Sequence, residues 1–161
     1  MMVRAVDVMA PPLCVAPDLE VEALGRLLVR ERADGACVTQ GGRLVGVVTG
    51  MDLVFRHKRL HPPAFLPLLD AVVPLERPGR FRREVDKVLG MKVDDVMTRQ
   101  VVTAAPDMLL EDVASMMVER HLTVVPVLRD DTLVGAITRF GLVQRWYGSD
   151  PAPSPPPGHA S

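Results

Sequence analysis

The chain has few of the residues that mark specialised classes of protein. Only two of its 161 residues are cysteines, and aromatic residues make up 4%. Two cysteines make a poor disulfide framework and a poor metal site. Because Cys14 and Cys37 lie in apolar runs, we expect two small buried hydrophobic side chains and no metal site. No stretch approaches the roughly 18 apolar residues that a membrane-spanning helix needs.

The chain also has no large surplus of positive or negative charge. The 19 Lys and Arg residues nearly balance the 20 Asp and Glu residues. Nucleic-acid binding relies on a basic surface that releases counterions, and the balanced charge disfavours such a role for the basic clusters at 56–59 and 77–83. Residues 1–9 contain Arg4 and Asp7 and no apolar stretch, so we expect no signal peptide, no membrane contact and a cytoplasmic location.

Catalytic motifs are also missing from the sequence. It contains no Gly-x-Ser-x-Gly nucleophile turn, no Walker glycine loop and no His-Glu-x-x-His pair. The four histidines are scattered along the chain. The sequence therefore favours a binding module over an enzyme.

What the chain does have is an internal repeat. Pro17-Asp18-Leu19 returns as Pro106-Asp107-Met108, and the segment from Leu44 to Thr49 returns as the segment from Leu133 to Thr138. Both pairs have the same spacing. Two copies are too few for a solenoid, so the repeat indicates a duplicated half-domain. Two related half-domains enclose one or two clefts, and we expect the functional site there.

Each copy has the pattern strand, helix, strand, strand, helix. In the first copy the pattern predicts strands at 13–16, 35–39 and 44–49, and helices at 18–32, with Asp18 as N-cap, and at 51–57. In the second copy it predicts strands at 101–103, 124–128 and 133–138, and helices at 110–120 and 140–147. Pro126 cannot donate to a sheet ladder, so it marks a sheet edge or a break.

The segment between the copies is too apolar for a flexible linker. We expect a short helix at 66–73, a turn at Pro78-Gly79, and a helix at 80–89 that ends at Gly90. The tail at 149–161 is rich in proline and has no apolar pattern, so we expect it to be disordered.

The end of the third strand in the first copy carries residues suited to a nucleotide. Thr49 stands beside a helix start, whose amides favour an anion, and Asp52 follows about one turn later. Thr49 can donate to a phosphate oxygen, and Asp52 can accept hydrogen bonds from two vicinal hydroxyls, as in a ribose. The same residues also fit a structural role, in which Thr49 caps the helix and Asp52 favours its dipole. The spacing leaves both interpretations open.

In their order, these residues resemble CBS domains, and the tandem pair resembles a Bateman module. The resemblance rests on Val96-Met97, Val102-Thr103 before Pro106-Asp107, Val124 to Val127, and Leu-Val-Gly-x-x-Thr in both copies. It implies an α/β (α+β) fold of two pseudo-symmetric repeats. We expect repeat 1 at 1–57, a helical insert at 58–91 like that of small stand-alone bacterial CBS proteins, repeat 2 at 92–148, and the tail at 149–161.

The resemblance also implies a ligand. CBS pairs bind adenosine compounds (AMP, ADP, ATP or sometimes S-adenosylmethionine) between the repeats as regulatory ligands, not as cofactors. In the family pattern Thr49 contacts the phosphate, Asp52 holds the ribose, and the other repeat covers the base. The residues implied for this first cleft are Thr49, Gly50, Met51, Asp52, Val102, Thr123, Val124 and Pro126.

The second cleft departs from the family pattern. Gly141 stands where the ribose carboxylate is expected. Asp34 would meet a phosphate with the wrong charge, although Arg139 could offset it. We therefore expect this cleft to be empty, weak or different in ligand. The residues implied for it are Leu13, Asp34, Gly35, Thr138 and Arg139.

The resemblance implies a regulatory module that senses an adenine nucleotide and signals to an unknown partner protein. The alternative is a ligand-free scaffolding pair that acts through its dimer surface, and the missing second carboxylate favours it. The helices after each third strand carry apolar residues such as Val54, Phe140 and Trp146. Exposed apolar patches mark interfaces, so we expect a homodimer with residues 65–75 at or beside the interface.

Overall fold

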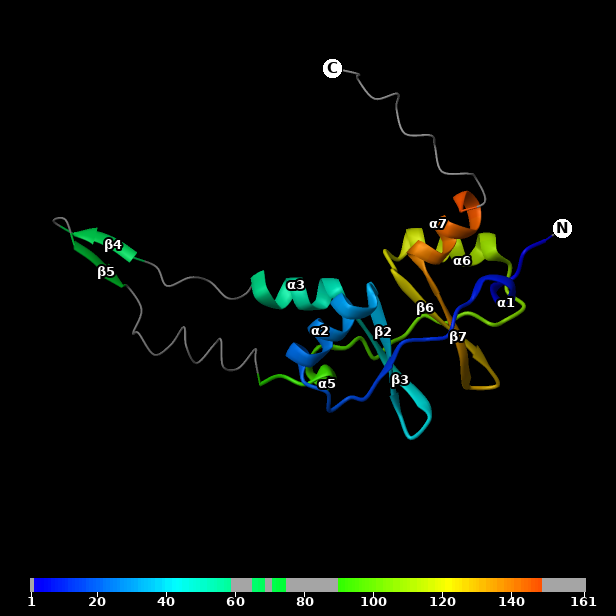
Figure 1. The fold of residues 1–161 in the computed structure, drawn as a ribbon, viewed down its shortest axis with the longest axis horizontal. Helices are drawn as coiled ribbons and strands as arrows, with labels where there is room; N and C mark the ends of the chain where they lie inside the picture. The colour runs from blue at the N-terminus through cyan, green and yellow to red at the C-terminus, as the bar shows by residue number, and fades with distance from the viewer. Residues whose placement is uncertain (1, 59–64, 69–70, 75–89, 149–161) are drawn as a thin grey trace, which may run out of the picture.

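The computed structural model describes residues 2–58, 65–68, 71–74 and 90–148 and shows two similar α/β halves (Figure 1). The first half contains α1 (Ala5–Val8), β1 (Cys14–Val15), α2 (Val21–Glu31), β2 (Gly35–Gln40), β3 (Arg43–Thr49) and α3 (Gly50–Lys58). The second contains α5 (Val93–Val96), α6 (Leu110–Glu119), β6 (Val124–Arg129), β7 (Thr132–Thr138) and α7 (Arg139–Tyr147). Between them lie β4 (Phe65–Leu68) and β5 (Ala71–Pro74).

The repeat seen in the sequence is a repeat in the backbone. β2 pairs with β3 in antiparallel register, Gly35 opposite Thr49, and β6 pairs with β7 in the same way, Val124 opposite Thr138. Thr138 follows Thr49 by 89 positions (138 − 49), and the register shift in β2 after Val38 recurs in β6 after Val127 at the same offset. The predicted fold class and the two-copy organisation are confirmed.

The two copies differ at their first strand. In the first copy the Cys37 amide donates to the Leu13 carbonyl (2.8 Å), and β1 joins β2 as a parallel strand. Pro126 occupies the position of Cys37 and has no amide hydrogen to donate. The strand predicted at 101–103 is therefore wrong, and only Ala104 makes a parallel bridge, to Val127. The prediction that Pro126 marks an edge or break is confirmed.

The short helix before each copy packs on the other copy. Ala5 of α1 is fully buried in the core of the second copy, and Val93 of α5 is fully buried in the core of the first. The chain before β1 then pairs with β7, because the Ala10 amide donates to the Ala136 carbonyl at 3.0 Å. The matching bond in the other half runs from the Thr98 amide to the Val47 carbonyl, at 2.8 Å. This exchange ties the halves together.

The glycine of the repeated Leu-Val-Gly sequence makes room for this exchange. A Cβ atom at Gly46 would lie 2.7 Å from the Met97 sulfur, and one at Gly135 would lie 2.7 Å from the Met9 sulfur. Real Cβ atoms do not approach a neighbour so closely. The repeated glycine is thus explained by the methionine that ends each exchanged segment.

A third cluster joins the two cores. It consists of Cys37 and Val47 from the first sheet, Val124 and Ala136 from the second, and partly buried residues packed around them. Burial of aliphatic surface at this junction stabilises the association of the halves. The same junction forms the floor of the site described below.

The helix predicted at 66–73 is wrong. β4 and β5 form an antiparallel pair, with Phe65 opposite Pro74 and Leu68 opposite Ala71. Pro67 would remove a helical hydrogen bond and clash with the preceding turn, and the β-branched Val72 and Val73 favour a strand. The insert is therefore not helical over these residues. The helix predicted at 80–89 and the tail at 149–161 lie outside the described residues.

Two smaller predictions need correction. Glu20, not Asp18, is the N-cap of α2, and it makes no side-chain capping bond. Cys37 is buried, but Cys14 is exposed, because β1 is a two-residue strand at the edge of its sheet. Within the described part of the chain, no helix is long and apolar enough to cross a membrane.

Candidate functional site

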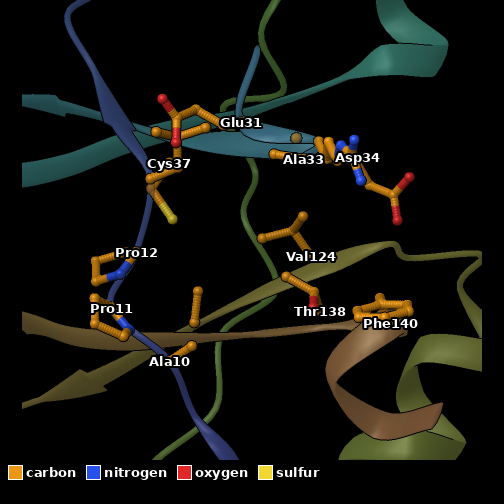
Figure 2. Close-up of a pocket in the computed structure, with 14 residues that line it drawn as sticks. Ala10, Pro11, Pro12, Glu31, Ala33, Asp34, Cys37, Val124, Thr138 and Phe140 are labelled. Atoms are coloured by element: carbon orange, nitrogen blue, oxygen red, sulfur yellow. The ribbon is translucent and has the colours of Figure 1, made fainter. Parts of the chain in front are cut away.

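A cavity of about 350 Å³ lies between the two repeats (Figure 2). Part of its wall comes from the first repeat, through the end of α2 and the start of β2. Another part comes from β6, β7 and α7 of the second repeat, and the segment before β1 closes one end. Lining residues include Pro11, Pro12, Leu13, Asp34, Gly35, Cys37, Val124, Ala136, Thr138 and Phe140. A site built from both repeats can respond to a change in their relative position.

This cavity is the second cleft of the sequence prediction. Leu13, Asp34, Gly35 and Thr138, which the sequence analysis assigned to that cleft, all line it. Arg139 pairs with Asp34 across the two repeats. Val124 was assigned to the first cleft, yet it lines this cavity because β6 begins at the junction of the halves.

The ion pair between Asp34 and Arg139 is loose. The Arg139 Nη2 atom lies 3.4 Å from each carboxylate oxygen of Asp34, whereas charge-assisted bonds usually measure about 2.7–2.9 Å. The side chains of Arg139 and Asp34 are 64% and 39% exposed. Such an exposed pair contributes about 0–1 kcal/mol, so a ligand can compete for either partner at little cost.

Thr138 caps the helix that borders the cavity. Its Oγ1 atom accepts a hydrogen bond from the Gly141 amide at 3.0 Å. With that bond made, the hydroxyl hydrogen is still available for donation. A Cβ atom at position 141 would lie 3.2 Å from Thr138 Oγ1. Because Gly141 has no side chain, the capping hydroxyl is not crowded.

Thr49 and Asp52 form a different cap in the first repeat. The Thr49 amide donates to Asp52 Oδ2 at 2.8 Å, and the Thr49 hydroxyl donates to the same oxygen at 3.2 Å. These bonds tie the two residues to each other at the start of α3, which is a local structural role. Both bonds use Oδ2, and Oδ1 remains the oxygen through which Asp52 would meet a ligand. Gly50 begins α3, and Met51 is 66% exposed.

The residues predicted to face Thr49 and Asp52 come from the second repeat. Val124 and Pro126 are buried and Val102 is half-buried. Among the described residues, Thr123 Oγ1 is a buried polar atom without a hydrogen-bond partner. An unpaired buried hydroxyl is costly, so it indicates a place for a water or a ligand polar atom.

Several residues of the cavity were not predicted from the sequence. Cys37, Ala136 and Phe140 line it but were assigned to strands and to an apolar helix face. Their correspondence with residues of the other repeat could have identified them. At the offset of 89 positions, Cys37 corresponds to Pro126, Ala136 to Val47, and Phe140 to Met51. Pro126 and Met51 were both assigned to the first cleft.

Burial affects the thiol that lines the cavity. Removal from water, with a smaller contribution from Cys14, raises the pKa of Cys37 to about 12. The thiol is therefore protonated and neutral at ordinary pH and acts as an apolar part of the wall. Over the described residues, no group of three or more His, Cys, Asp or Glu side chains could hold a metal ion.

Comparisons with known proteins agree with this architecture. The chain is 33% identical over 149 residues to the uncharacterized protein MJ1426 of Methanocaldococcus jannaschii, an alignment that covers 86% of this chain and 88% of that protein. The crystal structure of CBSX2 in complex with AMP is similar with a TM-score of 0.67 and 25% identity, covering 90% of this chain and 96% of CBSX2.

A second similar structure is the CBS domain pair of protein MJ0100, in complex with 5-methylthioadenosine and S-adenosyl-L-methionine. It has a TM-score of 0.66 and 18% identity and covers 93% of this chain and 100% of that chain, a likeness of fold. The model of the CBS domain matches residues 3–58 and 93–147, which are the two repeats with their exchanged helices. The chain therefore belongs to the CBS-domain family.

Proposed function

We propose that this chain is a regulatory module that binds an adenine nucleotide between its two CBS repeats and signals to a partner protein in the cytoplasm. The observation that carries the proposal is that the repeats enclose ligand-sized space between them: the second cleft is a cavity of about 350 Å³ with walls from both repeats, and the first cleft is formed by the repeat-related residues. That volume lies within the range of about 300–1,000 Å³ for small-molecule sites. The module acts by binding and not as an enzyme.

Similar proteins support an adenosyl ligand. CBSX2 was crystallised with AMP, and it aligns with nearly the whole of this chain. The MJ0100 pair holds two adenosyl compounds in the same fold. We propose AMP, ADP or ATP as the first candidates for this chain and S-adenosylmethionine as a further one.

The first cleft has the groups that a nucleotide requires. Asp52 can offer Oδ1 to the ribose, because its capping bonds use Oδ2 alone. Thr49 stands at the start of α3, where backbone amides favour a phosphate. Thr123 Oγ1 is buried and unpaired on the opposing repeat. We propose that nucleotide binding gives this hydroxyl its partner.

The scaffolding alternative has one observation in its favour. The bonds between Thr49 and Asp52 already satisfy a helix start, so these residues are explained without a ligand. In that case the module would act through its surface alone. The two functions differ in whether a nucleotide binds at all.

A homodimer fits both functions. Exposed apolar residues occur in repeat-related pairs on α2, α6, α3 and α7. These pairs are Val29 with Val118, Met51 with Phe140, and Val54 with Val143. A patch that repeats under a pseudo-two-fold axis can pair with the same patch on a second copy of the chain. We propose that a second copy covers this surface.

Native mass spectrometry of freshly purified protein tests these proposals together. The expected result is a mass near twice 17.6 kDa, with an added mass that matches an adenosyl compound. A dimer that takes up no added AMP, ADP, ATP or S-adenosylmethionine would support the scaffold. A single-chain mass at low micromolar concentration would contradict the dimer.

A further inference from the structure

The cavity between the repeats has no surplus of positive charge. Glu31, Arg32 and Asp34 line it, and Arg139 is paired with Asp34 at its edge. Two carboxylates thus face two guanidinium groups. A nucleotide with two or three phosphates would bring several negative charges to a site that offers no net compensation. Like charges at close range strongly disfavour binding.

The repeat-related positions in the first cleft carry a different set of charges, in which Asp52 is the carboxylate and Gly50 stands in place of Arg139. Arg120 stands 89 positions after Glu31, His121 after Arg32 and Thr123 after Asp34. Arg32 and His121 even share the left-handed backbone, with φ of 51° and 53°. The carboxylates Glu31 and Asp34 are thus replaced by a cation and a neutral hydroxyl. The same backbone therefore presents two different electrostatic environments.

Asp34 has hydrogen-bonding capacity to spare. An ionised carboxylate can accept about four hydrogen bonds, and the contacts of Asp34 with Arg139 are long, at 3.4 Å. Figure 2 shows Asp34 and Phe140 at one end of the cavity and Pro12 and Cys37 at the other. An acceptor for a ribose thus stands at the first end, while Pro12 and Cys37 offer apolar surface to a base at the second end, beside the Glu31 carboxylate.

We propose that this cavity selects a nucleoside without negative charge, and that Asp34 is the residue that determines this specificity. The inference rests on the proposed function, because it assumes an adenosyl ligand. Asp34 takes the place of the carboxylate that is missing at Gly141 and accepts hydrogen bonds from the ribose, as carboxylates do in dinucleotide sites. The base lies against Pro12 and the neutral thiol of Cys37.

Titration calorimetry of the full-length chain with adenosine and with ATP tests this proposal. Changes in the NMR chemical shifts of the Gly35 and Thr138 amides show whether adenosine binds in the cavity. For the wild type we expect adenosine to bind in the cavity more tightly than ATP does there. Asp34→Asn should weaken adenosine about tenfold or more, because a charge-assisted bond is lost. It should also strengthen ATP binding at the cavity, because Arg139 loses its partner.

Asp131→Asn is the matched control, since Asp131 is exposed in the β6–β7 turn with φ of 62°, a conformation that Asn also tolerates. It removes the same charge and should change neither affinity. Equal adenosine affinity in the Asp34→Asn and wild-type proteins would overturn the proposal, as would tighter ATP than adenosine binding in the wild-type cavity. If nucleotides still bound in an Asp52-dependent way, the proposed function would stand. Absence of binding by every adenosyl compound would overturn both.

Discussion

The two clefts of this molecule share a backbone but differ in chemistry. In the first, Asp52 accepts from Thr49 and a neutral Thr123 stands on the opposing repeat. In the second, Thr138 accepts from Gly141, and a carboxylate, Asp34, stands at the position that corresponds to Thr123. Duplication thus preserved the strands and helix starts, while a few substitutions changed the charge at each helix start.

The largest expected effect concerns the pair Gly35 and Val124, which occupy the same position in the two repeats. A Cβ atom at Gly35 would lie 2.7 Å from the Val48 carbonyl oxygen, a backbone atom that cannot move aside. Gly35→Val should therefore lower the free energy of unfolding by about 3 kcal/mol, the cost of overpacking a close-packed region. Urea denaturation followed by circular dichroism measures this change.

Gly25→Ala is the matched control, since a Cβ atom there meets Leu53 at an ordinary 3.7 Å. Within helix α2 the change should raise stability by about 0.5–1 kcal/mol. If Gly35→Val were as stable as the wild type, the two repeats would not differ at this position as described.

The second effect concerns the carboxylate that only the first cleft has. Asp52→Ala should weaken adenine nucleotide binding by about tenfold to a hundredfold, because bonds to a charged group contribute roughly 1.5–3 kcal/mol. Asp112→Ala removes a carboxylate from the same position of another helix, the third residue of α6. It should cost similar helix stability and leave nucleotide affinity unchanged. Calorimetry in which both variants match the wild type would show that Asp52 is only a cap.

The third effect is a pH dependence of stability that only the first repeat should contribute, because the second repeat has Pro126 at the position of Cys37. Burial raises the pKa of the Cys37 thiol from 9.0 to about 12. Between these values the unfolded chain loses this proton and the folded chain keeps it, so stability should fall as pH rises above 9. The slope should be about 1.4 kcal/mol per pH unit. Cys37→Ala should lose this slope in urea denaturation from pH 8 to 11, and an unchanged slope would assign it to other groups.

The smallest effect tests whether one carboxylate can make the second cleft like the first. Gly141→Asp should improve nucleotide binding in the cavity by a few-fold. For this, Thr138 must turn its hydroxyl toward the new carboxylate, as Thr49 does toward Asp52. The gain is limited because a Cβ atom at 141 crowds Thr138 Oγ1 at 3.2 Å and because Asp34 remains. Weaker nucleotide binding than in the wild type would show that crowding dominates.

Much of the fold could be predicted from the sequence because the same pattern of strands and helices occurs in both repeats. The strands ending at Thr49 and Thr138 and the break at Pro126 follow from apolar runs and from the missing proline amide. The exchange of α1 and α5 could not be predicted, since a four-residue helix does not indicate which core will bury it. The β4–β5 hairpin was missed because its apolar run has no clear period.

The site was predicted only in part, for a related reason. Polar residues such as Asp34 and Thr138 can be recognised from their residue type as possible ligand contacts, and the structure places them on the cavity. Cys37 and Ala136 have an ordinary core character and become wall residues only when the two sheets meet. Whether Asp52 caps a helix or holds a ribose depends on a ligand, and the capping bonds are compatible with either role.

A calorimetric titration of the wild-type chain with AMP, ADP and ATP tests the difference between the two clefts most directly. We expect one of these nucleotides to bind with micromolar affinity and a stoichiometry of one per chain, because only the first cleft combines a ribose carboxylate with a helix start free of an opposing acid. Two equal sites per chain would contradict the difference between the clefts. No binding of any of the three would contradict the proposal that AMP, ADP or ATP is the ligand.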